Sequence, residues 1–557
     1  MIHVVALFLS FLLTASLVLL FMKIAARLGV MLDQPNHRKI HKEPIPRTGG
    51  LAVIIGSLLP LIVIFRGDRI VLGLCLGAMC ILIFGIMDDL WNLNYKWKFV
   101  GQGLAATLAL LISGIRFHTL GELWQGFPLD LGMFSLPLGI FFLVATTNMI
   151  NLSDGLDGLA GGICFLIFCA VGFLAYFQRD FRLLSLSICV LGAIAGFLRY
   201  NTHPAIVFLG DTGSQFLGFA AGFSMLLLTQ SKTVSSPIIP LYLIGIPFID
   251  TTMVIFERLR QRRPIFRADK NHIHHKLLKM GLRHGESVMV IYVLQLGMIL
   301  IAWTGRYADN AVLFVSFLFL TGVSLYFFTL DSRITWVVKY PNNNSSANPV
   351  KTRSAGSLIM SRKMMAKATW YGLLCVLFLF YFVSPLVIKS ISKSIGLYSV
   401  SMIVCLLLLK RFAIRDINIF LSISFNFLAL YYILFTEYSK QSFYIPFQYR
   451  HYYNILFFVL AMCYIGHLIS TYEKISFTTN DFLMLAVVIL LFFLPKDYDW
   501  TSHFRSIAVK FFLIFICIEL IFKKLETKKD FALTPAILAL GLNSLVSFLP
   551  YFFEVIG

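Results

Sequence analysis

The chain has 557 residues, of which 58% are hydrophobic and only 13% are charged. Soluble proteins are roughly half apolar and about a quarter charged, so this composition excludes an ordinary soluble enzyme and indicates a polytopic membrane protein. The formal net charge of +20 fits Lys and Arg gathered in cytoplasmic loops and suits anionic lipids or phosphorylated substrates. Nucleic acid is not an expected partner, because no soluble basic domain or recognition motif is present.

Long apolar runs predict an all-α fold that crosses the lipid bilayer many times, since a span needs about 20 apolar residues. We expect about 11 transmembrane helices before residue 330 and about seven after residue 367. The runs in the first part are 3–22, 49–65, 70–87, 99–115, 131–150, 159–177, 182–198, 214–229, 237–256, 288–304 and 310–330. Those in the second part are 368–388, 395–409, 417–436, 453–470, 481–494, 506–522 and 532–553.

A polar stretch at 331–367 divides these two sets of helices and includes Pro341-Asn-Asn-Asn-Ser-Ser-Ala-Asn-Pro349. Such a composition is typical of a linker. The predicted organisation is therefore a membrane-embedded core at 1–330, a cytoplasmic linker at 331–367 and a transmembrane region of unknown role at 368–557. All the motifs described below lie in the core.

Basic loops set the predicted orientation in the membrane. The loop after the first span, the loop Arg258–Gly285 and the linker are rich in Lys and Arg, and the span count places them all on one side. By the positive-inside rule that side is the cytoplasm, and the N-terminus lies outside. The same count places three acidic motifs on the cytoplasmic face.

The first acidic motif is Asp88-Asp89, which closes the third predicted span. Adjacent carboxylates repel each other unless a cation or a proton lies between them. The pair could therefore bind Mg²⁺ or supply a base. A solvated helix end explains it equally well when the motif is taken alone.

The second motif is Asn151-Leu-Ser-Asp154-Gly-Leu-Asp157-Gly, which opens the sixth predicted span. One Asp at a helix N-terminus is an ordinary cap, but two at i and i+3 share a helical face. Glycines beside them let a ligand approach the backbone closely. This pattern favours a nucleotide or metal site over simple capping.

The third motif is Gly210-Asp211-Thr-Gly-Ser214, which precedes another apolar run. Backbone N–H groups at such a helix start can bind phosphate, and the carboxylate can bind a cation. Taken alone, a tight turn with a helix cap explains it at least as well.

The basic loop Arg258–Gly285 contains His272-Ile-His274-His275. This pattern could bind a transition metal. No Cys is near, however, and the carboxylates elsewhere suggest a hard cation that prefers oxygen. We therefore interpret the histidines as donors to a diphosphate. The abundance of Lys and Arg there is explained by topology alone.

Taken together, the ordered motifs resemble the polyprenyl-phosphate N-acetylhexosamine-1-phosphate transferases. The resemblance covers about residues 33–285. Its matches are Asp33-Gln-Pro-Asn36…Arg47-Thr-Gly-Gly50, Asp88-Asp89…Lys98…Gln102, Asn148…Asn151…Asp154-Gly-Leu-Asp157, Tyr200-Asn201…Pro204, Phe208…Asp211…Ser214, Pro247…Asp250-Thr251 and Ala268-Asp269…His272-Ile-His274-His275. The His-x-His-His form is similar to the branch that uses simple UDP-N-acetylhexosamines rather than to the muropeptide branch.

The sequence departs from the family pattern in two places. Asn92 stands where many members of the UDP-N-acetylhexosamine branch have a third Asp, which puts a metal role for this position in doubt. Residues 368–557 have no counterpart in typical members.

The resemblance implies a Mg²⁺-dependent enzyme (with Mn²⁺ as an alternative) of the bacterial inner membrane, with its site on the cytoplasmic face. It would transfer an N-acetylhexosamine-1-phosphate from a UDP-sugar to undecaprenyl phosphate and release UMP. This reaction is the first step of a cell-surface polysaccharide such as O-antigen, a teichoic-acid-type polymer or capsule. A homodimer stays open.

The family's site residues transfer to this chain position by position. The implied catalytic residues are Asp88, Asp89, Lys98, His272, His274 and His275. The implied metal ligands are Asp211, Asp88, Asp89 and Asp154, and the implied substrate-binding residues are Asn151, Asp154, Asp157, Arg267 and Asn201. Lys98 and the three histidines would neutralise the diphosphate.

Two alternatives remain at this stage. One is the phospho-MurNAc-pentapeptide transferase reaction of peptidoglycan synthesis, which uses a muropeptide donor. The other is a transporter or flippase of lipid-linked sugars. Transporters place polar residues near the bilayer midplane in related halves, whereas here the acidic residues cluster at one predicted face.

Overall fold

The computed structural model describes residues 2–34, 43–124, 127–230, 235–264 and 271–329, two later helices at 479–492 and 506–518, and isolated residues between 433 and 464. The predicted linker at 331–367 lies outside these residues, as do most of the spans predicted after it. Of the seven predicted there, 481–494 corresponds to α18 (Thr479–Phe492) and 506–522 to a helix at Ser506–Ile518.

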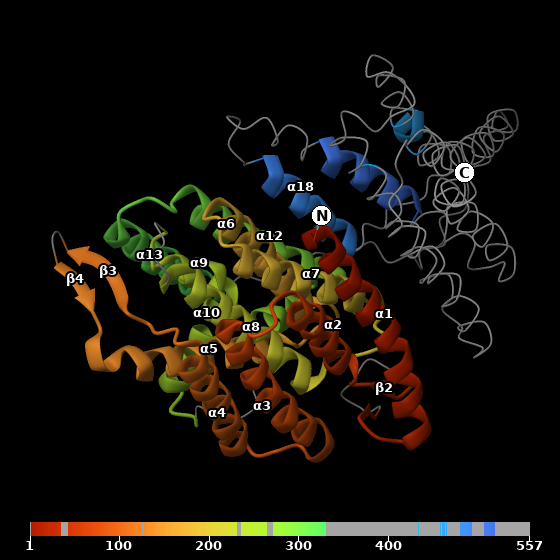
Figure 1. Ribbon diagram of the computed structural model, residues 1–557, viewed down its shortest axis with the longest axis horizontal. Coiled ribbons are helices and arrows are strands. Elements are labelled where there is room, and N and C mark those ends of the chain that lie inside the picture. Colours follow the sequence, from red (N-terminus) through yellow and green to blue (C-terminus); the bar gives the residue numbers. More distant parts are fainter. Residues whose placement is uncertain are drawn as a thin grey trace, which may run out of the picture. The chain divides into compact units, whose positions relative to one another are not determined.

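The first 330 residues are predominantly helical (Figure 1). The helices are α1 (Ile2–Leu28), α2 (Gly49–Ile64), α3 (Arg69–Trp91), α4 (Tyr95–Ser113), α5 (Ser135–Ser153), α6 (Leu159–Phe177), α7 (Phe181–Asn201), α8 (Gly210–Gln230), α9 (Ile239–Leu243), α10 (Gly245–Arg260), α11 (Ile273–Lys279), α12 (His284–Thr304) and α13 (Asn310–Thr329). A short 3₁₀ turn, η1 (Gly132–Phe134), precedes α5.

Two small antiparallel sheets interrupt this helical pattern, and the all-α prediction did not include them. Strand β1 (Leu32–Asp33) pairs with β2 (Ile45–Pro46), and Leu32 lies opposite Pro46. Strand β3 (Thr119–Trp124) pairs with β4 (Phe127–Asp130) in an irregular hairpin. Strands β1 and β2 have two residues each, too few to show the apolar alternation from which a strand is predicted, and the six residues of β3, Thr-Leu-Gly-Glu-Leu-Trp, do not alternate strictly.

Every apolar run predicted in the first part coincides with helix, but the run at 237–256 is broken into α9 and α10. Pro247 lacks an N–H, so it cannot bond to the carbonyl of Leu243 four residues earlier. The Gln295 side chain of α12 bonds to the backbone groups left unpaired at the break. Its amide nitrogen donates to Leu243 O at 2.7 Å, and its oxygen accepts from Ile246 N at 3.2 Å. A buried break in a membrane helix needs such a partner.

Among the described residues, six helices are long and apolar enough to cross a membrane: Val5–Leu28, Arg69–Trp91, Gly132–Ser153, Leu159–Phe177, Phe181–Asn201 and His284–Thr304. The chain is therefore a multi-pass membrane protein. The predicted total of 11 spans plus seven stays a prediction.

By compactness the chain divides into two units. One comprises Met1–Pro341 with Thr478–Ala486, and the other comprises Asn342–Phe477 with Val487–Gly557. The first contains all the motifs identified above. The predicted domain boundaries at 330 and 367 fall outside the described residues and stay predictions.

Helix α8 lies at the centre of the first unit, with α2, α3, α5 and α6 against it (Figure 1). Every residue of α8 from Thr212 to Thr229 is buried. Small residues permit this close packing, as is usual between membrane helices. A Cβ on Gly85 of α3 would lie 2.6 Å from Thr212 Cα, and one on Gly218 would lie 2.7 Å from Thr147 Cα of α5.

The closest backbone approach to α8 is between Gly50 of α2 and Gly213 of α8. A Cβ at Gly50 would lie 2.3 Å from the Gly213 nitrogen and 2.7 Å from the Leu209 carbonyl oxygen. These are backbone atoms, so they cannot rotate away. The start of α8 is thereby fixed against the start of α2.

We expect Gly50→Ala to destabilise the protein by about 1–3 kcal/mol, the usual cost of inserting a methyl group into a packed interior. Gly103→Ala is the control, because Gly103 lies inside α4 with nothing within 4 Å of an added Cβ. That change should be neutral or slightly stabilising. Thermal unfolding of both variants in detergent measures the difference, and equal midpoints would contradict the packing described.

Candidate active site

The N-terminus of α8 is capped by Asp89 from α3. The Asp89 carboxylate accepts hydrogen bonds from Asp211 N at 2.9 Å, Thr212 N at 3.0 Å and Thr212 Oγ1 at 2.6 Å. A buried helix start leaves N–H groups that need acceptors, and a carboxylate there also interacts favourably with the helix dipole. Both Asp89 oxygens are thus engaged by α8, so the arrangement favours a positioning role for Asp89.

Asp88, the neighbour of Asp89, forms a buried ion pair with Lys98 of α4. Lys98 Nζ lies 2.6 Å from Asp88 Oδ2 and 3.5 Å from Asp211 Oδ2. Asp88 is only 1% exposed and also accepts from Leu93 N at 2.9 Å. Burial acts to lower the pKa of Lys98, but the charges of Asp211 and Asp88 outweigh it and raise this pKa. The ammonium group therefore stays charged between the two carboxylates.

Asp211 also contacts Asn151, which lies in the last helical turn of α5. The Asn151 amide nitrogen donates to Asp211 Oδ1 at 2.7 Å and to Ser214 Oγ at 2.8 Å. The Asp211 side chain is 29% exposed, unlike the buried Asp88. Asp211 therefore combines a fixed orientation with access from solvent.

A backbone ladder joins the loop before α2 to the loop before α8. Phe208 N donates to Pro46 O at 2.8 Å, and Gly50 N donates to Leu209 O at 2.8 Å. Arg47 in this ladder forms an ion pair with Asp33 of β1, and its charge also acts on Asp154. Arg47, which stands in one of the matched motifs, therefore lies at the acidic cluster.

Asp154 follows α5 and lies among like charges. It keeps a solvent-exposed face, yet the protein packed around it removes water and raises its pKa to about 8, and the charges of Asp211 and Asp89 act in the same direction. This is the direction expected for a carboxyl group beside other carboxylates. Negative charge here exceeds the nearby positive charge, so the site attracts cations.

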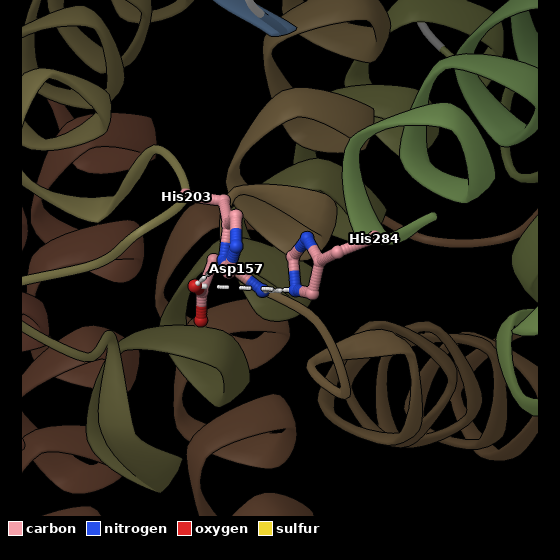
Figure 2. A group of neighbouring side chains, drawn as sticks. All are labelled: Asp157, His203 and His284. Carbon is pink, nitrogen blue, oxygen red and sulfur yellow. Dashed lines mark hydrogen bonds and ion pairs between the residues drawn. The ribbon is translucent and has the colours of Figure 1, made fainter. Parts of the chain in front are cut away.

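Asp157 and Asn201 connect the loop before α6 to the loop before α8. Asn201 accepts from Gly158 N at 2.9 Å and donates to Val207 O at 2.9 Å, and it is 4% exposed. Asp157 Oδ2 lies 2.7 Å from His203 Nδ1 and accepts from Ala205 N at 3.2 Å (Figure 2). Both residues thus bind other parts of the protein, which favours positioning over direct substrate contact.

The histidines of α11 lie beside the acidic loop. His274 packs on Gly155, where an added Cβ would lie 2.3 Å from His274 Nε2, and the His274 and His275 rings are 4.2 Å apart. Burial, then the charge of His275, lowers the pKa of His274 to about 4. A neutral His274 can bind a phosphate oxygen only as a hydrogen-bond donor, not as a cation.

His272 is oriented by Asp250 of α10. His272 Nδ1 lies 2.9 Å from Asp250 Oδ2, and Ile273 N donates to Asp250 Oδ1 at 2.7 Å. The pairing fixes the ring, so that Nε2 is the nitrogen available to a ligand. Asp250 was not among the predicted site residues, although it stands in one of the matched motifs. Arg267 was among the predicted site residues, but it lies outside the described residues.

In total, the structure brings together the predicted residues Asp88, Asp89, Lys98, Asn151, Asp154 and Asp211, and places His274 beside their loop. Asp33, Arg47 and Asp250 stand in matched motifs but were given no site role, and His203 and His284 were not in any match. Only the fold shows what these residues contact. Whether each predicted residue binds substrate or metal stays a prediction.

The arrangement defines a helical membrane protein with an acidic, lysine-bridged site at one end of its central helix. Its sequence matches the profile of glycosyl transferase family 4 over residues 71–229. It is 39% identical over 300 residues to a probable undecaprenyl-phosphate N-acetylglucosaminyl 1-phosphate transferase of Bacillus subtilis, covering 53% of this chain and 82% of that protein. The undecaprenyl-phosphate alpha-N-acetylglucosaminyl 1-phosphate transferase of Salmonella typhi is 31% identical over 289 residues, 50% of this chain and 78% of that protein.

The chain therefore belongs to glycosyl transferase family 4, as the motif resemblance implied. Both alignments cover about half of this chain, which is close to the length of the predicted core.

We expect Asp89→Ala to cost about 1–3 kcal/mol of stability, because buried N–H groups at the start of α8 lose their acceptor. Asp89→Asn should cost less, since its amide oxygen can still accept one bond. Asp68→Ala is a matched control: Asp68 is the ordinary cap of α3 and accepts from Ile70 N at 2.8 Å. Its loss should cost about 1 kcal/mol or less. Thermal unfolding compares the three, and an Asp89→Ala midpoint no lower than that of Asp68→Ala would contradict the capping role.

Proposed function

We propose that this protein transfers N-acetylglucosamine-1-phosphate from UDP-N-acetylglucosamine to undecaprenyl phosphate and releases UMP. The observation that carries the proposal is the Lys98 ammonium between the Asp88 and Asp211 carboxylates at the start of α8. It is supported by the activities for which the Bacillus subtilis and Salmonella typhi relatives are named. The product would begin a cell-surface polysaccharide.

In the proposed reaction an oxygen of the lipid phosphate attacks the β-phosphorus of the UDP-sugar. A new P–O bond forms, the bond from the β-phosphorus to the bridging oxygen breaks, and the bridging oxygen leaves with UMP. The protein's contribution is positioning and electrostatic stabilisation, as in other phosphoryl transfers. Lys98 is placed to neutralise phosphate oxygens, and Asp88 holds the ammonium group by their 2.6 Å contact.

Asp211 is the group best suited to hold Mg²⁺. Mg²⁺ commonly uses one or two carboxylates together with substrate phosphates and waters. Asp211 is partly exposed, carries a hydrogen bond that fixes its orientation and lies among other carboxylates, so the donor chemistry fits. When bound, the ion would polarise the phosphate oxygens. We propose Asp154 as a second, nearby oxygen donor.

The histidines complete the proposed donor site. Asp250 orients His272, and His274 is buried and neutral beside Gly155. His274 can offer an N–H group to a diphosphate without adding a charge, whereas His272, whose Nδ1 is held by Asp250, would donate to the diphosphate from Nε2 as the imidazolium. Arg267, which precedes α11 in the sequence and lies outside the described residues, is proposed to contact the sugar nucleotide.

Exposed aromatic side chains beside the cluster suit a lipid acceptor. Trp91 ends α3, and Trp97 lies next to Lys98 at the start of α4; they are 67% and 59% exposed. Tryptophan is enriched where a membrane meets water. Together with the basic loops in the sequence, this supports a site at the cytoplasmic surface, which a polyprenyl phosphate could reach from the membrane.

A transporter is disfavoured by where the polar groups lie along their helices. Asp88 is near the end of α3, Asn151 near the end of α5, and Asp211 at the start of α8. Transporter sites instead lie near the bilayer midplane.

We expect Asp211→Asn and Asp88→Asn each to lower UMP release by about 100-fold or more, the usual cost of removing one electrostatic stabiliser. The assay uses the purified chain, UDP-N-acetylglucosamine, undecaprenyl phosphate and Mg²⁺. Asp130→Asn is the control, because this exposed carboxylate lies in the β3–β4 hairpin. Near wild-type turnover by a correctly folded Asp211→Asn or Asp88→Asn protein would contradict the role of that residue.

A further inference from the structure

Three side chains meet at one point beside the α5–α6 loop (Figure 2). They are Asp157 of that loop, His203 of the loop between α7 and α8, and His284 at the start of α12. Each offers one ligand atom, and these atoms lie within 4.8 Å of one another. We call them the two-histidine cluster. No metal role was predicted from the sequence for His203 or His284. Asp157 belongs to the Asn151–Gly158 motif, which was interpreted as a nucleotide or metal site.

Both imidazoles have a nitrogen near the same carboxylate oxygen. His203 Nδ1 lies 2.7 Å from Asp157 Oδ2, and His284 Nε2 lies 3.9 Å from it. The rings are stacked with centroids 4.0 Å apart and planes inclined by only 18°. Because a bound ion lies in the plane of each imidazole that binds it, one ring would have to turn on binding, and the exposed His203 ring is the one free to do so.

The tautomer of His284 is fixed by the backbone. Asp157 N lies 3.2 Å from His284 Nε2. A backbone N–H can only donate, so Nε2 is the unprotonated nitrogen, and its lone pair accepts the Asp157 N–H. A metal ligand requires such a lone pair. A metal ion would therefore replace two contacts: the hydrogen bond from Asp157 N to His284 Nε2, and the proton between His203 Nδ1 and Asp157 Oδ2.

We propose that Asp157, His203 and His284 form a binding site for a transition-metal ion of the Zn²⁺ class. Bonds of about 2.0–2.1 Å in a tetrahedral site place ligand atoms roughly 3.4 Å apart. The distances of 2.7 and 3.9 Å to Asp157 Oδ2 bracket this value, so the two pairs would need to move by roughly 0.7 and 0.5 Å. Two imidazole nitrogens with one carboxylate select Zn²⁺ or Ni²⁺ over Mg²⁺, which prefers oxygen.

The site also has access to solvent. The His203 side chain is 41% exposed, while those of Asp157 and His284 are 19% and 12% exposed. This leaves an entry path and a fourth position for water. In contrast, His272-Ile-His274-His275, whose sequence pattern allows transition-metal binding although we preferred a diphosphate ligand, forms no group of three converging ligand atoms among the described residues.

An ion in this cluster would join three separate segments. Asp157 lies in the loop between α5 and α6, and His203 belongs to the loop that leads into Asp211. His284 begins α12. The ion would therefore act as a clamp on the two loops that form the acidic site, and it is distinct from the oxygen-bound Mg²⁺ proposed at Asp211.

The test is Zn²⁺ binding by the purified full-length protein, followed by competition with a chromogenic chelator. The protein is prepared without a polyhistidine tag, which would itself bind Zn²⁺. Excess Mg²⁺ is added to occupy sites formed by oxygen ligands. The variants are His203→Ala and His284→Leu. His118→Ala is the matched control, because His118 is exposed and belongs to no such cluster.

We expect the wild type and His118→Ala to bind Zn²⁺ with equal affinity, and X-ray absorption to show two imidazole ligands. Each cluster variant should bind Zn²⁺ at least 10-fold more weakly. Mutation of a residue that only hydrogen-bonds to a metal ligand already lowers metal affinity by about 10–100-fold. His203→Ala removes an exposed ring and keeps the test valid if His284→Leu folds poorly. Equal Zn²⁺ affinity in wild type and His203→Ala, or no binding by the wild type, would overturn the proposal.

Discussion

The architecture of the site depends on how one buried helix begins. Helix α8 runs through the centre of the bundle with its residues Thr212–Thr229 buried, so water cannot satisfy its first N–H groups. Asp89 supplies both carboxylate oxygens to them. Because Asp88 is the next residue, the same contact sets the position of the carboxylate that holds Lys98. The contact that caps α8 through Asp89 therefore also fixes the positions of Asp88 and Lys98.

Close packing reinforces this arrangement. Gly50, Gly85 and Gly213 allow α2, α3 and α8 to approach until backbone atoms touch. The loops that precede α2 and α8 are joined by backbone hydrogen bonds, and Asn151 fixes Asp211 from α5. Charged groups can remain in such a place only because each has a fixed partner, since an unpaired charge away from water is costly.

Much of the fold follows from the sequence because long apolar runs leave few alternatives in a membrane. Each run before residue 330 became helix, but the two small sheets and the helix break near Pro247 were missed. The hydrogen bonds at that break come from Gln295, which lies 48 residues after Pro247 in the chain. The acidic motifs indicated a cluster, but not the division of labour within it. That Asp89 caps α8 while Asp88 binds Lys98, and that Asp250 orients His272, follows from contacts between distant segments. His203 and His284 also could not be assigned from the sequence, because neither stands in a pattern that suggests a ligand.

The most direct test of the account follows the β-phosphate of the donor. The purified protein is incubated with undecaprenyl phosphate, Mg²⁺ and UDP-N-acetylglucosamine that carries the label in its β-phosphorus. Transfer of the sugar phosphate predicts that the label enters the lipid fraction while unlabelled UMP is released in equal amount. Label that remains in water-soluble UDP while the sugar enters the lipid would show transfer of the sugar alone. That result would contradict the phosphotransfer chemistry assigned to the Asp88, Lys98 and Asp211 cluster.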